Sequence, residues 1–160
     1  ASAFTQSSGN IPATLRALFA TAEFGAQAVR GAKFKRPFHF VVSALRATNA
    51  ETDASKQLVD YLVRLGHAPF RYATPDGYPE AASHWQNSLL WRWNFASALA
   101  SNGIKGTKID PEALRARVGG DAELMAMVLG RTPSPLEREA YHESGAGLAL
   151  LLASPAFQHC

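Results

Sequence analysis

The chain has 160 residues, of which 47% are hydrophobic and 18% are charged, and its formal net charge is +3. This balance predicts one packed globular domain over residues 1–160 and excludes an intrinsically disordered chain. No apolar run approaches the roughly 18 residues that a membrane span requires. The single cysteine, Cys160, excludes an internal disulfide and a cysteine-based zinc site, which leaves a free thiol or an intermolecular bond.

The first half of the chain predicts four helices. Asn10 and Pro12 are typical of a helix start, and Gly66 is typical of a helix end. The segment 37–48 is rich in valine and phenylalanine, so it would also suit a strand. We expect the four helices at residues 13–20, 22–30, 37–48 and 54–65. In the first two we expect four apolar side chains to be exposed: Leu15, Leu18, Phe19 and Phe24.

An irregular segment, called here the loop 67–83, follows these helices. It contains three prolines and Gly77, and roughly seventeen residues without regular structure are uncommon in a compact domain. Such a segment is usually functional or is packed by its own side chains. We therefore expect the loop to be rigid, with at least two of its three aromatic side chains largely buried: Phe70, Tyr72 and Tyr78.

A long helix over residues 84–101 is the predicted centre of the fold. On a helical wheel its apolar residues cover most sides, and Trp85, Leu89 and Trp93 share one face. The pattern predicts that this helix is buried on most sides. Together the elements predict an all-α fold: an irregular array of short and medium helices around the helix 84–101, with the loop 67–83 packed across it.

The remainder of the chain predicts further short helices. Asp110, Asp121 and Ser134 are residue types that cap helix N-termini, and we expect each of them to begin a short helix. The final apolar run, GLALLLA, covers residues 147–153 and leads into a second hydroxyl cap.

Arg92 lies close to the apolar face of the predicted central helix. An unpaired charge at such a position is costly, so we predict that Arg92 is mostly buried and bonded to the loop 67–83. Its partners there would be backbone carbonyls or the carboxylates of Asp76 or Glu80. The stretch 74–95 thus supplies four residues for a ligand site or a loop clamp: Asp76, Tyr78, Trp85 and Arg92.

The positive charge of the first half of the chain is concentrated in one cluster: Arg30, Lys33, Lys35 and Arg36. Such a cluster can attract phosphate polymers or anionic lipid, although a solvated loop before a helix explains it more simply. No helix-turn-helix, RNA-binding aromatic signature or zinc finger accompanies it, so a nucleic-acid partner is not favoured.

Metal and cofactor signals are weak. Glu139 and His142 have the Glu-x-x-His spacing of di-metal helical bundles, but the sequence contains no second copy of this motif. A solvated charged face is the simpler explanation of these residues. Phosphate-binding and dinucleotide-binding glycine patterns, and the serine-hydrolase elbow, are absent from the sequence. We predict neither a metal site nor a cofactor.

Four segments, in order, resemble the bacterial domain of unknown function family 1800. They are KFKRPFHFVVSALRAT, LVRLGHAPFRYATPDGYPEAASHW, LLWRWNFASALA and LLLASPAFQ. The resemblance implies a largely helical protein, exported to the periplasm or the cell exterior, with no established activity. It also implies that these residues are the C-terminal part of a longer chain, with any signal segment upstream. His39 stands where members often carry glutamate, and Tyr78 where many carry tryptophan.

Two classes of function remain open at this stage. The first is a structural or interaction module of an exported bacterial protein, which performs no chemistry and docks against the missing N-terminal half or another protein. The second is part of a hydrolase-like enzyme that acts on an extracellular polymer or an anionic substrate at the region 74–95. The first is favoured because no nucleophile–base pair or metal-ligand set can be identified.

Overall fold

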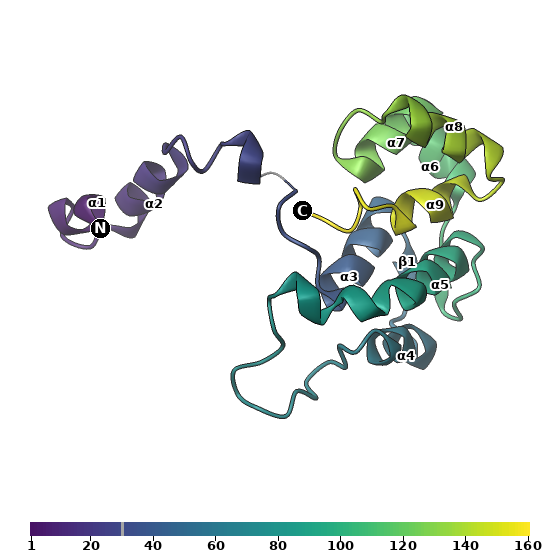
Figure 1. The fold of residues 1–160 in the computed structure, drawn as a ribbon, viewed down its shortest axis with the longest axis horizontal. Coiled ribbons are helices and arrows are strands. Elements are labelled where there is room, and N and C mark those ends of the chain that lie inside the picture. Colours follow the sequence, from purple (N-terminus) through teal and green to yellow (C-terminus); the bar gives the residue numbers. More distant parts are fainter. Residues whose placement is uncertain (30) are drawn as a thin grey trace. The chain divides into compact units, whose positions relative to one another are not determined.

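Helices dominate the structure, a computed structural model that describes residues 1–29 and 31–160 (Figure 1). The all-α class predicted from the sequence is confirmed, because the strands among these residues, β1 (Glu51–Thr52) and β2 (Thr107–Lys108), are only two residues long. The chain divides into two compact units, one of residues 1–33 with Cys160 and one of residues 34–159. The sequence itself predicts a single domain over residues 1–160.

The unit of residues 1–33 contains the helices α1 (Ser2–Gln6) and α2 (Ile11–Phe19) and a 3₁₀ turn (Gln27–Val29). As the sequence predicts, the side chain of Asn10 caps α2 by accepting a hydrogen bond from the backbone N–H of Ala13 at 2.9 Å. Neither helix contains a buried residue. The predicted exposure of Leu15, Leu18, Phe19 and Phe24 is confirmed.

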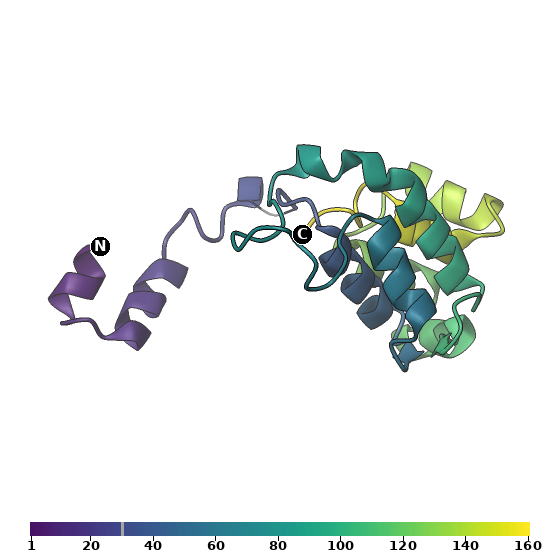
Figure 2. The same cartoon turned by 90° about the horizontal axis from the view of Figure 1, so that it is seen from below.

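The unit of residues 34–159 contains seven α-helices among its residues, all of which the structure describes. They are α3 (Pro37–Ala47), α4 (Lys56–Arg64), α5 (Leu89–Ala100), α6 (Pro111–Val118), α7 (Asp121–Leu129), α8 (Pro135–Glu143) and α9 (Gly147–Ala153). The short strands pair antiparallel, with Glu51 opposite Lys108 and Thr52 opposite Thr107. The helix α9 packs against α5 and also against α7 and α8, so it connects the central helix α5 to these two later helices (Figures 1 and 2).

Helix α5 differs from the predicted central helix in two respects. It begins at Leu89, after two 3₁₀ turns at Ala82–His84 and Gln86–Ser88. Its buried residues are Arg92, Phe95, Ala96 and Leu99, while Leu89 and Trp93 are exposed. The predicted face was wrong because apolar residues surround this helix almost completely, so their spacing does not indicate which side packs. The helix nevertheless lies at the centre of the fold as predicted, but only the side that carries Arg92, Phe95 and Leu99 is buried.

The core of this unit forms around the ring of Phe95. Edge-to-face contacts join it to Phe40 of α3, with ring centroids 5.7 Å apart, and to Tyr61 of α4, at 5.4 Å. Phe157, beyond α9, reaches the same cluster through Phe40 at 5.9 Å. Residues far apart in the sequence therefore share one apolar centre, which fixes α3, α4, α5 and the C-terminal segment relative to each other.

Helix caps set the ends of the later helices. Ser134 forms a capping box at α8: its Oγ accepts from the Glu137 N–H at 3.2 Å, and the Glu137 carboxylate accepts from the Ser134 N–H at 2.8 Å. Asp110 caps α6 through the N–H of Ala113. The predicted cap at Asp121 is wrong, because Gly120 holds that position and the Asp121 carboxylate instead accepts a hydrogen bond from the Tyr141 hydroxyl at 3.1 Å.

Gly147 allows α8 and α9 to pack closely. A Cβ atom at this position would lie 2.7 Å from the ring of Tyr141 and 2.9 Å from its carbonyl oxygen. The ring cannot move away freely, because its hydroxyl is bonded to Asp121. The backbone carbonyl is less mobile still. A side chain of any size at residue 147 must therefore displace α8 or α9.

We expect Gly147→Ala to destabilise the protein by roughly 1–3 kcal/mol through overpacking. Alanine is the better helix former by about 1 kcal/mol, so propensity alone would give a change of the opposite sign. Gly103→Ala is the matched control, because a Cβ there meets its neighbours at an ordinary 3.4 Å. Urea unfolding measures the loss in the free energy of unfolding for both variants. Equal unfolding midpoints would contradict the close packing of α8 and α9.

Candidate functional site

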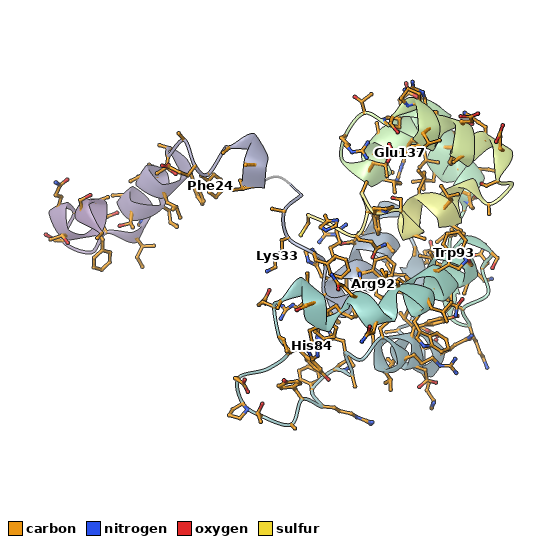
Figure 3. All side chains as sticks on the ribbon, viewed as in Figure 1. Phe24, Lys33, His84, Arg92, Trp93 and Glu137 are labelled. Carbon is orange, nitrogen blue, oxygen red and sulfur yellow. The ribbon has the colours of Figure 1, made fainter. Side chains whose placement is uncertain are left out.

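Arg92 is the most completely buried charge in the region 74–95. Its side chain extends from the first turn of α5 (Figure 3) and is buried, with 1% of its surface exposed. Its Nε donates to the hydroxyl of Ser88 at 3.1 Å, Nη1 to Oε1 of Gln158 at 2.8 Å, and Nη2 to the carbonyl oxygen of Lys35 at 2.7 Å. The guanidinium therefore links the start of α5 to two distant segments of the chain.

Aromatic rings complete the surroundings of this cation. The guanidinium carbon lies 4.5 Å from the ring centroid of Phe34 and 4.9 Å from that of Phe40. Such faces attract a cation, more strongly when water is excluded. Burial lowers the pKa of Arg92 to about 10, so the group remains charged at neutral pH. All three of its hydrogen-bond acceptors are uncharged.

The predicted burial of Arg92 is confirmed, whereas its predicted bond to the loop 67–83 is wrong. Because α5 starts at Leu89, the arginine in its first turn faces the segments around Lys35 and Gln158. The two acids proposed as its partners lie elsewhere: Asp76 is exposed and accepts a hydrogen bond from the Thr74 hydroxyl, and Glu80 pairs with Arg36 at 2.9 Å.

The two segments that Arg92 binds also pair with each other. Phe34 and His159 form an antiparallel bridge, and the Lys35 N–H donates to the Gln158 carbonyl at 2.8 Å. Gln158 in turn donates from Nε2 to the carbonyl of Leu152, at 3.2 Å. The amide of Gln158 thus has both of its ends bonded, one to the arginine and one to α9.

Trp85 and Tyr78, the two other aromatic candidates, form a cluster around His67. The indole of Trp85 is almost fully buried and donates from Nε1 to the Pro79 carbonyl at 3.0 Å. The Tyr78 hydroxyl donates to the Ala68 carbonyl at 2.8 Å. The imidazole of His67 lies 4.2 Å from the Tyr78 ring and stacks on the Trp85 ring at 5.4 Å. The loop therefore folds back onto its own first residue.

The loop is anchored by fewer of its aromatic residues than the sequence suggests. Tyr78 is partly buried, but Phe70 is fully exposed and Tyr72 is also exposed, so the expected burial of two of the three is wrong. The side chain buried beneath the loop is instead that of Trp85, which follows the loop in the sequence. Phe70 also has a left-handed backbone, with φ of 59°, a conformation that is rare for a bulky residue.

His67 also connects the loop to α3. Its Nδ1 accepts a hydrogen bond from the backbone N–H of Phe38 at 3.4 Å. Arg36 occupies the N-cap position of α3 and makes no side-chain capping bond. Burial and the nearby Arg36 guanidinium both lower the pKa of His67 below its ordinary value of 6.5. Nothing in the sequence indicates a role for His67, because neither its spacing nor its neighbours form a known motif.

The four cations of the predicted anion cluster have different surroundings. Arg30 lies outside the described residues. Lys35 is buried, and its Nζ lies 3.9 Å above the Phe157 ring. Arg36 is paired with Glu80, and Lys33 is exposed, with its backbone bonded to Cys160. Two of the four cations are therefore already engaged within the unit 34–159, and an anion-binding role for the cluster stays a prediction.

A cavity of about 350 Å³ lies beside the paired strands, away from all of these candidates. Its walls come from the end of α3, both strands and one face of α6: Thr48, Asn49, Glu51, Lys108, Ile109, Asp110, Ala113, Leu114 and Arg117. No motif in the sequence indicates it, because the lining residues come together only in the folded chain. A second hollow, of about 370 Å³, shares Glu51 and Lys108 with it.

Within residues 1–29 and 31–160, no group of three or more histidine, cysteine, aspartate or glutamate side chains could hold a metal ion. In the same residues, no helix has the length and apolar character of a membrane span.

A family model described as "Protein of unknown function (DUF1800)" matches residues 1–159 of the chain. No curated protein and no solved structure matches it.

We expect Arg92→Met to reduce the free energy of unfolding by about 3 kcal/mol. A methionine would fill much of the space but would leave buried oxygens of Gln158 and Lys35 without a donor, and hydrogen bonds to a charged group are worth about 1.5–3 kcal/mol each. Arg46→Met, at an exposed arginine in the last turn of α3, is the matched control. Chemical denaturation measures the free energy of unfolding of the two variants. A loss no larger than that of the control would show that the bonds of Arg92 contribute nothing to stability.

Proposed function

The chain belongs to the DUF1800 family, whose function is unknown, and we propose that it serves as a helical interaction module of an exported bacterial protein. The observation that supports this most directly is the unit of residues 1–33. Its two helices have five and nine residues and contain no buried residue. Helices this short are marginal in water without packing. An apolar partner surface would supply the burial that the unit lacks.

The apolar residues of α2 suit one mode of recognition. Ile11, Leu15 and Leu18, with Phe19 beside them, recur at intervals of four and three residues, and all four are at least 43% exposed. This spacing presents a single apolar face, the pattern by which an amphipathic helix binds a groove. Residues 1–33 carry three cationic residues and one acidic residue. We therefore propose a protein partner whose groove is apolar with an acidic rim.

Export to the periplasm or the cell exterior is the second part of this proposal. It rests on the family resemblance alone, and the partner would then be another exported protein or another part of a longer chain of the same family. The segment 34–159, with its buried aromatic core, would be the independently packed part of the module.

A catalytic role for the region 74–95 is weakened by the burial of Arg92. A guanidinium that is 1% exposed and bonded to three protein acceptors cannot reach an anionic substrate. The cavity beside the paired strands offers a different place for a small molecule. Its volume of about 350 Å³ falls within the range of small-molecule sites.

We therefore propose binding of a small organic anion in this cavity as a second candidate function. The side chains of Lys108 and Arg117 line the cavity, and neither side chain forms a hydrogen bond or ion pair with another described residue; the same holds for one carboxylate in the wall, that of Glu51. The carboxylate of Asp110 is already engaged as the cap of α6. The buried side chains of Ile109 and Leu114 add an apolar wall. A small molecule with a carboxylate and a compact apolar group would fit both the two cations and the apolar wall.

The interaction proposal predicts that contacts are made through one face of α2. We expect a photoreactive phenylalanine analogue at Leu18 to crosslink to one other protein in the producing cells, and the same analogue at Ala17, on the opposite face, to give no adduct. Leu15→Glu should abolish the adduct from residue 18 and leave the unfolding of residues 34–159 unchanged. Adducts containing only two copies of this chain, or equal adducts from both positions, would overturn the proposal.

The cavity proposal predicts selective binding of a carboxylate probe. We expect benzoate, but not benzylamine, to shift the NMR signals of backbone amides within residues 48–51 and 108–117. Replacing both Lys108 and Arg117 by alanine should weaken benzoate binding about tenfold, which corresponds to ~1.4 kcal/mol. Lys105→Ala is the control, since this lysine does not line the cavity. Preferential binding of benzylamine, or unchanged benzoate binding in the double variant, would contradict the assignment.

A further inference from the structure

Helix α3 begins without a capping side chain of its own. Arg36 occupies the N-cap position, and Pro37, the first helical residue, has no N–H. The first N–H of the helix is therefore that of Phe38, one of the donors that a helix N-terminus leaves unsatisfied. His67, from the start of the loop 67–83, accepts from this N–H at 3.4 Å through Nδ1. An imidazole nitrogen can accept a hydrogen bond only while it is unprotonated.

The surroundings of His67 mostly oppose a positive charge. On the α3 side are the positive end of the helix dipole and the guanidinium of Arg36. The carboxylate of Glu80, which could offset them, is bound to Arg36 at 2.9 Å. On the other side are the rings of Tyr78 and Trp85, which would attract an imidazolium. Tyr72 contacts the Tyr78 ring, and His84 contacts the Trp85 ring. The balance favours neutral His67, whose pKa is lowered.

The same imidazole holds the loop closed. Tyr78 packs on His67 at 4.2 Å and its hydroxyl is bonded to the Ala68 carbonyl, while Trp85 stacks on the other side of the cluster. Arg36 adds a second connection, through Glu80 and, at 3.5 Å, through the Tyr78 carbonyl. Loss of the contact between His67 and Phe38 would thus loosen both the start of α3 and the packing of Tyr78 and Trp85.

We propose that the loop 67–83 is a pH-sensitive latch: neutral His67 caps α3 and holds the loop against it, and protonation of His67 releases the loop. Protonation places a new N–H donor opposite the N–H of Phe38, beside Arg36, so the capping bond becomes a repulsion. The released loop would uncover Trp85, which is 2% exposed in the closed form.

The sign of the pH dependence follows from the lowered pKa. Above pH 6.5 His67 is neutral in both the closed and the released forms, so the closed form keeps its full stability. As the pH falls below 6.5, the released form takes up a proton that the closed form binds less readily, and closure weakens until the pH passes the lowered pKa. Because one proton is involved, the released fraction rises by at most about tenfold for each pH unit.

The experiment measures hydrogen exchange at the indole Nε1–H of Trp85, whose bond to the Pro79 carbonyl exists only in the closed loop. The exposed indole of Trp93 serves as the reference for the intrinsic rate. We expect the protection of Trp85 relative to Trp93 to be constant above pH 7 and to fall by up to tenfold per unit below 6.5. Protection that is independent of pH between 7.5 and 5 would overturn the proposal.

Three variants separate His67 from other titrating groups. His67→Asn places an amide oxygen near the position of Nδ1 and cannot titrate, so it should keep the loop protected across the whole range. His84→Asn and Glu80→Gln should both retain the acid response. A response that persists in His67→Asn, or that disappears in either of the other two, would assign the proton to a different group and contradict the latch.

A direct measurement on the unaltered protein covers the case in which a variant fails to fold. The nitrogen-15 signals of His67 should show an unprotonated Nδ1 and a protonated Nε2 at pH 7.5, and should titrate with a midpoint below 6.5, at the lower end of the pH range over which Trp85 loses its protection. A protonated Nδ1 at pH 7.5, or a midpoint above 6.5, would overturn the proposal.

Discussion

The guanidinium of Arg92 is a buried cation that only an assembled structure can accommodate. Its acceptors come from three separate parts of the chain, at Ser88, Lys35 and Gln158, and a charge left in this position without them would be strongly unfavourable. The segments around residues 35 and 158 must therefore be in place before the first turn of α5 can be buried. The two segments also hold each other in place, because the Lys35 N–H donates a hydrogen bond to the Gln158 carbonyl.

This constraint extends from the core to the loop 67–83. Lys35, whose carbonyl Arg92 binds, is followed by Arg36 and by the start of α3. With the backbone fixed at residue 35, Arg36 reaches Glu80 and the Phe38 N–H meets His67. The residue that the sequence suggested as a clamp on the loop thus acts on it indirectly, through the segment that α3 and the loop share. Residues 1–33, by contrast, expose the apolar side chains of their helices, which is why we assign them the interaction role.

Sequence reasoning identified the features that depend on local chemistry. The caps at Asn10, Asp110 and Ser134, and the burial of Arg92 in an apolar helix, could all be derived from neighbouring residues. It did not identify features that depend on distant contacts. The apolar residues around α5 conceal which side packs, and nothing near His67 or Lys108 reveals an unfilled cap or a cavity wall. Arg92 illustrates both outcomes, because its need for acceptors was predictable and their identity was not.

The coupling between Arg92 and Gln158 tests most directly the claim that the guanidinium joins α5 to the C-terminal segment. Arg92→Met, Gln158→Leu and the double variant form a thermodynamic cycle, measured by chemical denaturation. Contacting residues in one hydrogen-bond network typically show interaction energies of about 0.5–3 kcal/mol. We expect the double variant to be more stable than the sum of the two single losses would allow, by at least ~1 kcal/mol. Losses that add to within about 0.3 kcal/mol would mean that the two side chains act independently, and would contradict the claim.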